Sequence, residues 1–108
     1  MKDDVYRLTV VNESTIHGKG LFAREEIEID SWLGTYEGPE ASRNGSHVLW
    51  VYEDDGLVGR SGRNKLRYLN HSTNPNAEFN GFDLFALRDI RVGEEVTIHY
   101  GEDWEDIN

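Results

Sequence analysis

The groups best suited to binding chemistry lie in one polar segment. Residues 67–77 read Arg-Tyr-Leu-Asn-His-Ser-Thr-Asn-Pro-Asn-Ala, so an amide and an imidazole, Asn70 and His71, stand side by side. The segment is too polar for an ordinary core strand, and Pro75 interrupts any helix. We therefore predict a rigid loop that presents the amide and the imidazole to a ligand. From these two residues alone, a polar turn bonded to its own backbone is the simpler interpretation.

Two other segments carry residue types that suit a ligand site. The first reads His-Gly-Lys-Gly-Leu-Phe-Ala over residues 17–23, and its two glycines permit a close approach of the backbone to a ligand. No long helix follows, so this is not a dinucleotide-binding turn. The second, residues 93–101, ends in His99-Tyr100-Gly101 after an alternating run. Alone, Tyr100 reads as a half-buried strand tyrosine.

The elements that must position these groups are short strands. β-Branched and aromatic runs separated by Gly, Pro, Asn and Asp predict strands over 5–11, 21–23, 32–36, 48–52, 57–58, 78–82, 84–87 and 96–100. Turns at 54–56 and at Gly81 predict two hairpins. Residues 40–46 are expected to be a surface loop, and 65–69 one helical turn. No segment has a 3.6-residue period of any length, so we predict an all-β fold.

Composition limits the partners. The 108 residues suffice for one domain, and 21 acidic against 11 basic residues give a net charge of −10. This charge argues against direct nucleic acid binding and favours a basic protein or peptide partner. The absence of cysteine excludes disulfides and thiolate zinc sites, and the four histidines lack metal-ligand spacing, so no metal is expected. No membrane segment or leader is evident; we expect a soluble, intracellular protein of the cytoplasm or nucleus.

In their order and spacing, the three segments together resemble the SET-domain protein lysine methyltransferases. The resemblance runs from about Arg7 to Trp104. It implies an all-β β-clip with a pseudoknot near the C-terminus, a SET core over 5–101 and a short acidic tail over 102–108. The chain looks like a minimal, viral or bacterial-type form without the pre-SET and Cys-rich post-SET segments. With so small a substrate-reading insert, a homodimer is one way to complete the substrate groove.

The resemblance also implies S-adenosylmethionine as cofactor and assigns roles to particular residues. Tyr100 would be the catalytic residue, and it would share a lysine channel with Phe79 and Ile98. Relatives often carry a tyrosine before the central strand; here either His47 fills part of that role or the contact is absent. Trp50 and Tyr52 either face the channel or belong to the core, and from strand alternation we expect one of them to be core. The cofactor-binding residues would be Lys19, Gly20, Leu21, Arg67, Asn70, His71 and Trp104. Arg67 would also help to fix the pseudoknot.

The implied reaction is the in-line transfer of a methyl group from a positive sulfur to a neutral lysine amine. The free pKa of lysine is about 10.4, and a narrow aromatic channel beside a sulfonium disfavours the ammonium form. The substrate would be a basic tail, histone-like or ribosomal. The alternative is a catalytically weak SET-like module that binds a lysine-rich partner.

Overall fold

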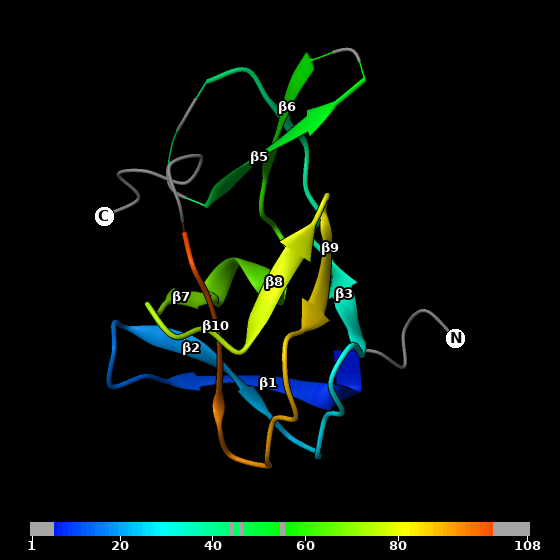
Figure 1. Ribbon diagram of the computed structural model, residues 1–108. Coiled ribbons are helices and arrows are strands. Elements are labelled where there is room, and N and C mark those ends of the chain that lie inside the picture. The colour runs from blue at the N-terminus through cyan, green and yellow to red at the C-terminus, as the bar shows by residue number, and fades with distance from the viewer. Residues whose placement is uncertain (1–5, 44, 46, 55, 101–108) are drawn as a thin grey trace.

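The computed structural model describes residues 6–43, 45, 47–54 and 56–100, which form short strands in three small sheets (Figure 1). The helical elements in this part of the chain are two 3-10 turns, residues 6–8 and η2 (Lys65–Tyr68). The strands are β1 (Thr9–Glu13), β2 (Lys19–Ala23), β3 (Trp32–Thr35), β4 (Glu40–Ala41), β5 (Val48–Glu53), β6 (Gly56–Ser61), β7 (Asn70–His71), β8 (Ala77–Asn80), β9 (Asp83–Ala86) and β10 (Glu95–Ile98).

The largest sheet, in the order β1-β2-β10-β7, joins the three segments that the sequence singled out. β2 carries the glycine segment and pairs antiparallel with β10, where Val96 lies opposite Leu21. β10 pairs on its other side with β7 in parallel, so that Ile98 lies opposite His71. The residues just before Tyr100 therefore lie beside the Asn70-His71 pair, although 25 or more residues separate them along the chain.

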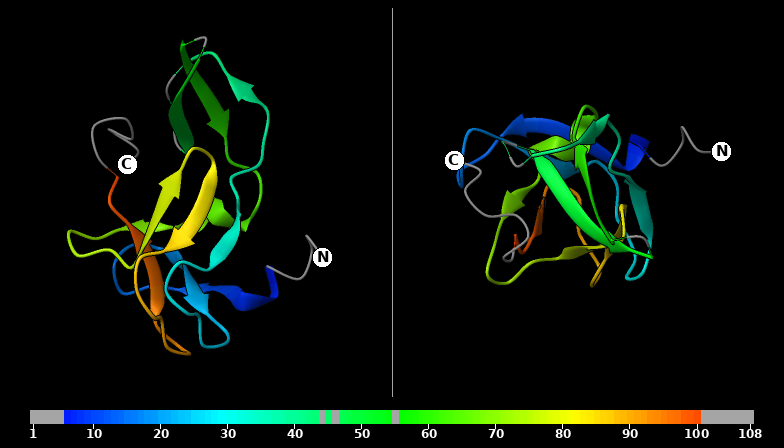
Figure 2. Two further views of the ribbon diagram at one scale, coloured as in Figure 1. Left: turned by 45° about the vertical axis from the view of Figure 1, so that its right-hand side comes forward. Right: turned by 90° about the horizontal axis from the view of Figure 1, so that it is seen from above.

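The other two sheets form the rest of the molecule. β3, β9 and β8 pair in that order, and β4, β6 and β5 form the third sheet. Figure 2 shows the β5–β6 hairpin standing at one end, away from β1 and β2. Alternate residues of β2, β8, β9 and β10 supply one core, because a strand directs every second side chain to the same face. The fully buried members include Leu21, Leu33, Leu66, Leu84 and Val96.

The all-β prediction and both hairpins are confirmed, and the differences lie at the ends of elements. Residues 6–8 form a 3-10 turn, so the strand predicted over 5–11 begins at Thr9. The loop predicted over 40–46 contains β4, which pairs with β6. The loop predicted around Asn70 contains β7. A strand of two residues is too short to show an alternating pattern in the sequence, and only its pairing with a neighbouring strand defines it. In the described ranges, no helix is long and apolar enough to cross a membrane.

Candidate functional site

Two cavities meet at Tyr100. The larger, of about 350 Å³, is lined mainly by apolar and aromatic side chains from β5, β8 and the end of β10. The smaller, of about 250 Å³, lies on the side of β7 and the loop before β2 and is lined by Ile16, His17, Asn70, His71 and Tyr100. Tyr100 is the one lining residue that these two cavities share. A group bound in one cavity would thus face a group bound in the other across this side chain.

Tyr100 is held by both its backbone and its hydroxyl. Its N–H donates to His71 Nδ1 at 2.9 Å, and its hydroxyl donates to the Leu69 carbonyl oxygen at 2.8 Å. The His71 and Tyr100 ring centroids lie 5.1 Å apart. Burial raises the pKa of the Tyr100 hydroxyl above its ordinary value, and the Glu95 carboxylate adds to the rise. The hydroxyl is therefore protonated at neutral pH and acts as a fixed hydrogen-bonding group.

The chain leading into Tyr100 is clamped by the polar segment that the sequence singled out. Asn76 is buried, its Nδ2 donates to the Glu95 carbonyl oxygen, and its Oδ1 accepts from Thr97 N–H, both at 2.8 Å. Ser72 N–H donates to the Ile98 carbonyl oxygen at 2.9 Å. These bonds join two distant parts of the chain as the predicted pseudoknot requires.

Asn70 is buried and directs its amide nitrogen into the protein. Nδ2 donates to the His17 and Lys19 carbonyl oxygens at 3.1 Å each and to Glu95 Oε2 at 2.8 Å. Asn70 also lines the smaller cavity, and its Oδ1, which takes part in none of these three bonds, is the amide atom that can accept from a ligand there. Neither Glu95 nor its partner Ser14 was identified from the sequence. The available signal was an acid at the start of an otherwise buried strand, β10.

Of the three residues predicted from the glycine segment, none lines the smaller cavity. Lys19 is exposed and contributes its carbonyl oxygen to Asn70. Gly20 is buried, and a Cβ there would lie 2.2 Å from Glu95 Oε2. The Leu21 side chain is in the core. Ile16 and His17 supply the wall of this cavity on the side of the loop before β2.

Arg67 and Trp104 complete the set of predicted cofactor residues. Arg67 lies on η2, lines neither of the two cavities, and has its guanidinium 5.4 Å from the Tyr68 ring centroid. Its carbonyl oxygen lies 2.9 Å from His47 Nδ1. Trp104 lies outside the described residues.

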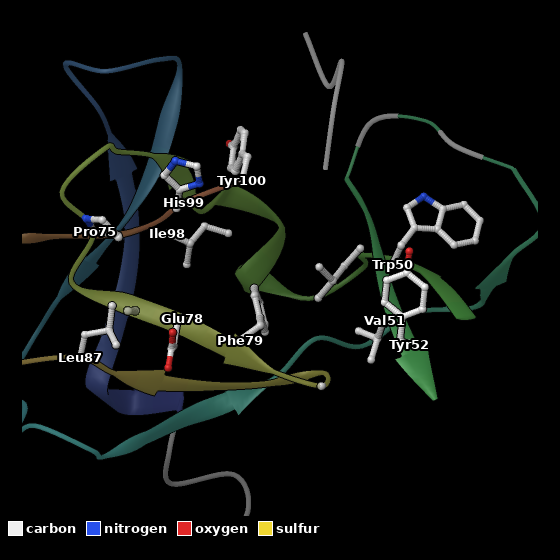
Figure 3. Close-up of a pocket in the computed structure, with 13 residues that line it drawn as sticks. Trp50, Val51, Tyr52, Pro75, Glu78, Phe79, Leu87, Ile98, His99 and Tyr100 are labelled. Carbon is white, nitrogen blue, oxygen red and sulfur yellow. The ribbon is translucent and has the colours of Figure 1, made fainter. Parts of the chain in front are cut away.

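The predicted channel residues come together in the larger cavity. Figure 3 shows Phe79, Ile98 and Tyr100 on one side and Trp50 and Tyr52, from β5, on the other. The expectation that one of Trp50 and Tyr52 is core is wrong. Tyr52 is 73% exposed and Trp50 is half-buried, and both line the cavity, because residues two apart on a strand share a face.

Tyr36 lies behind this wall and was missed by sequence reasoning. It is fully buried, and its ring meets Phe79 edge to face, with centroids 5.6 Å apart. Its hydroxyl donates to the His47 carbonyl oxygen, and burial raises its pKa well above the ordinary value. Tyr36 therefore contacts the backbone of His47, the residue that we considered for part of the upstream tyrosine's role. The signal was an aromatic residue at the end of the strand predicted over 32–36.

Comparison with known proteins places this arrangement in a family. The SET domain profile matches residues 18–101. The histone-lysine N-methyltransferase trithorax of Drosophila virilis is 30% identical over 118 residues, which cover 89% of this chain and 3% of that protein. The histone-lysine N-methyltransferase MEDEA of Arabidopsis thaliana is 30% identical over 112 residues, covering 84% of this chain and 16% of that protein.

Solved structures agree. The polycomb repressive complex 2 of Chaetomium thermophilum aligns with a TM-score of 0.77 at 25% identity, covering 93% of this chain and 16% of that one. A ctPRC2 structure in an autoinhibited conformation bound to S-adenosylmethionine gives 0.78 at 25% identity, covering 91% and 16%. This chain thus spans only a small part of these relatives. The profile match over residues 18–101 shows that the chain belongs to the SET-domain family.

Proposed function

We propose that this chain is an S-adenosylmethionine-dependent protein-lysine N-methyltransferase that acts on a basic protein tail, histone-like or ribosomal. The observation that carries the proposal is the position of Tyr100 as the one lining residue common to the two cavities. An in-line methyl transfer needs donor and acceptor to approach from opposite sides of one point. Two cavities that share a fixed tyrosine between them satisfy that requirement.

The smaller cavity suits a cationic ligand. The Asn70 Oδ1 atom can accept a hydrogen bond there, and the Glu95 carboxylate lies directly behind the amide. Negative charge beside an acceptor favours a positive group. S-adenosylmethionine, when bound, supplies a methyl group on a positively charged sulfur. We propose that Asn70, His71 and the loop at Ile16 and His17 hold it. Lys19, Gly20, Leu21 and Arg67 line neither cavity and would act through the residues that do. Trp104 stays a prediction.

The larger cavity suits a lysine side chain. Phe79 and Ile98 line it with apolar surface, which suits the aliphatic stem and excludes water from the amine. An apolar wall disfavours the ammonium form and so lowers the lysine pKa from its free value of about 10.4. The Tyr100 hydroxyl donates a hydrogen bond to the Leu69 carbonyl oxygen, which leaves its own oxygen lone pairs to accept from the amine and orient it. This scheme requires no strong general base.

The charge of the chain supports a basic substrate. A net charge of −10 attracts Lys- and Arg-rich segments and increases their rate of encounter. The relatives trithorax and MEDEA are both named histone-lysine N-methyltransferases, which supports a basic histone tail as the first substrate to try. Ribosomal proteins have the same basic character.

The test is transfer of a radiolabelled methyl group from S-adenosylmethionine to core histones and to a whole-cell lysate. Tyr100→Phe is assayed beside the wild-type chain. We expect label on a protein band with the wild type and a loss of about a hundredfold or more in the variant, because the hydroxyl that orients the amine is gone. Binding of S-adenosylmethionine, measured by calorimetry, should change little. Equal turnover by Tyr100→Phe would contradict the role assigned to Tyr100. A wild-type chain that binds peptide without labelling it would favour a binding module.

A further inference from the structure

The carboxylate of Glu95 connects the smaller cavity to the loop that borders it. Ser14 Oγ lies 2.8 and 2.9 Å from the two carboxylate oxygens, and Oε2 also accepts from Asn70 Nδ2 at 2.8 Å. Ser14 Oγ in turn accepts from Ile16 N–H at 2.9 Å. One carboxylate therefore reaches two cavity-lining residues, Asn70 and Ile16, from behind.

The space for this carboxylate is built into β2. Gly20 is buried, and a Cβ at that position would lie 2.2 Å from Glu95 Oε2 and 3.1 Å from Asn70 Nδ2. Any other residue there would displace one of these groups. The glycine therefore makes room for Glu95 and Asn70, a different purpose from the direct ligand approach expected of it.

The surroundings of Nδ2 determine which way the Asn70 amide faces. Three oxygens surround Nδ2: two backbone carbonyls and the Glu95 carboxylate. A flipped amide would direct Oδ1 at all three, and an oxygen that meets a carboxylate without a proton between them is repelled. Of the three acceptors, only Glu95 carries a full charge. Glu95 therefore contributes most to the preference for the observed orientation.

We infer that Glu95 is a positioning residue of the cofactor site, which holds the Asn70 amide so that Oδ1 accepts from a cationic group of the ligand. The inference rests on the proposed function, in which that group is the ammonium at the amino-acid end of S-adenosylmethionine. Glu95 does not line the smaller cavity, so it acts through Asn70 and makes no ligand contact of its own.

The first test compares two substitutions of adjacent glutamates. Glu95→Gln keeps the shape and removes the charge. Glu94→Gln is the matched control, because the Glu94 carboxylate accepts from Arg91 N–H in the turn before β10. Calorimetry gives the Kd of each variant for S-adenosylmethionine and for 5′-methylthioadenosine, which lacks the amino-acid group. We expect Glu95→Gln to bind S-adenosylmethionine roughly tenfold more weakly, since a charged acceptor becomes neutral. Its affinity for 5′-methylthioadenosine should match that of the control.

A second comparison asks whether Glu95 acts through Asn70. In an Asn70→Ala background, Glu95→Gln should cause no further loss, because the group that it positions is absent. Three results would overturn the inference: a further loss of affinity in the Asn70→Ala background, an equal loss for both ligands, or no difference between Glu95→Gln and Glu94→Gln. The proposed function would still stand in each case if the wild-type chain transfers methyl groups. Failure of the wild type to bind S-adenosylmethionine would overturn both. Should Glu95→Gln not fold, Ser14→Ala replaces it, with a loss of roughly threefold expected for S-adenosylmethionine alone.

Discussion

The two cavities that meet at Tyr100 have walls of opposite character. On the β7 side, Asn70, His71 and Glu95 are joined to backbone or to each other by hydrogen bonds. On the β8 side, Phe79 and Ile98 present carbon surface, and the Phe79 ring packs edge to face with Tyr36. We refer to these as the polar wall and the apolar wall.

The difference indicates how selective each cavity is. Hydrogen bonds are directional, so the polar wall accepts a ligand whose charged groups match fixed positions. Apolar contact has no direction, so the apolar wall accepts any side chain of suitable length and width. The polar wall thus suits one invariant cofactor, and the apolar wall suits peptides of varied sequence that share a lysine. Substitutions on the two walls should therefore impair different properties of the protein.

The largest effect is expected where the polar wall joins β10. Asn76→Ala removes the side chain that bonds two backbone groups, the partly buried Glu95 carbonyl and the buried Thr97 N–H. Each unsatisfied group costs about 1–3 kcal/mol, so the free energy of unfolding should fall by about 2–5 kcal/mol in urea titrations. Asn74→Ala is the control, because Asn74 is exposed and should change stability by less than about 0.5 kcal/mol. Similar losses for the two variants would show that the clamp is not what holds β10.

A smaller and different effect is expected on the apolar wall. Phe79→Tyr adds a hydroxyl to the lysine channel, which takes up space and can bond the amine in one orientation. We expect mass spectrometry of the labelled peptide to show several times less di- and trimethyl product, with a change of less than about twofold in affinity for S-adenosylmethionine. Phe85→Tyr, on the neighbouring strand and outside the cavity, is the control. An unchanged product distribution would mean that Phe79 does not limit the room around the amine.

The sequence allowed the fold class and the meeting of the three segments to be predicted. Alternation and turn residues identified both hairpins, because each depends on neighbours in the chain. The channel residues Phe79, Ile98 and Tyr100 were assigned through the family resemblance, and the structure brings them to one cavity. Local pattern and motif were sufficient for these features.

The features that escaped prediction depend on distant partners. Glu95 reads as one of two adjacent surface acids until its contacts with Ser14, 81 residues away, are known. Tyr36 reads as a strand residue until Phe79 is placed against it. Gly20 was interpreted through the flexibility of its backbone, whereas the neighbouring side chains of Glu95 and Asn70 explain why a glycine is needed there. A single sequence records residue types and not the pairs that they form, so the supporting contacts of a site are harder to predict than its ligand-facing groups.

The smallest expected effect concerns the support behind the apolar wall, where the His47 carbonyl holds the Tyr36 hydroxyl. Burial, followed by the charge of Arg67, lowers the His47 pKa below its ordinary value. The folded chain therefore binds this proton less readily than the unfolded chain, so stability is present above about pH 6.5 and is lost as pH falls below it. His47→Asn should flatten the decline in the free energy of unfolding between pH 7 and pH 5, and asparagine tolerates the φ of 65° found here. If urea titrations gave parallel curves for the two chains, His47 would not be the group that makes this wall sensitive to acid.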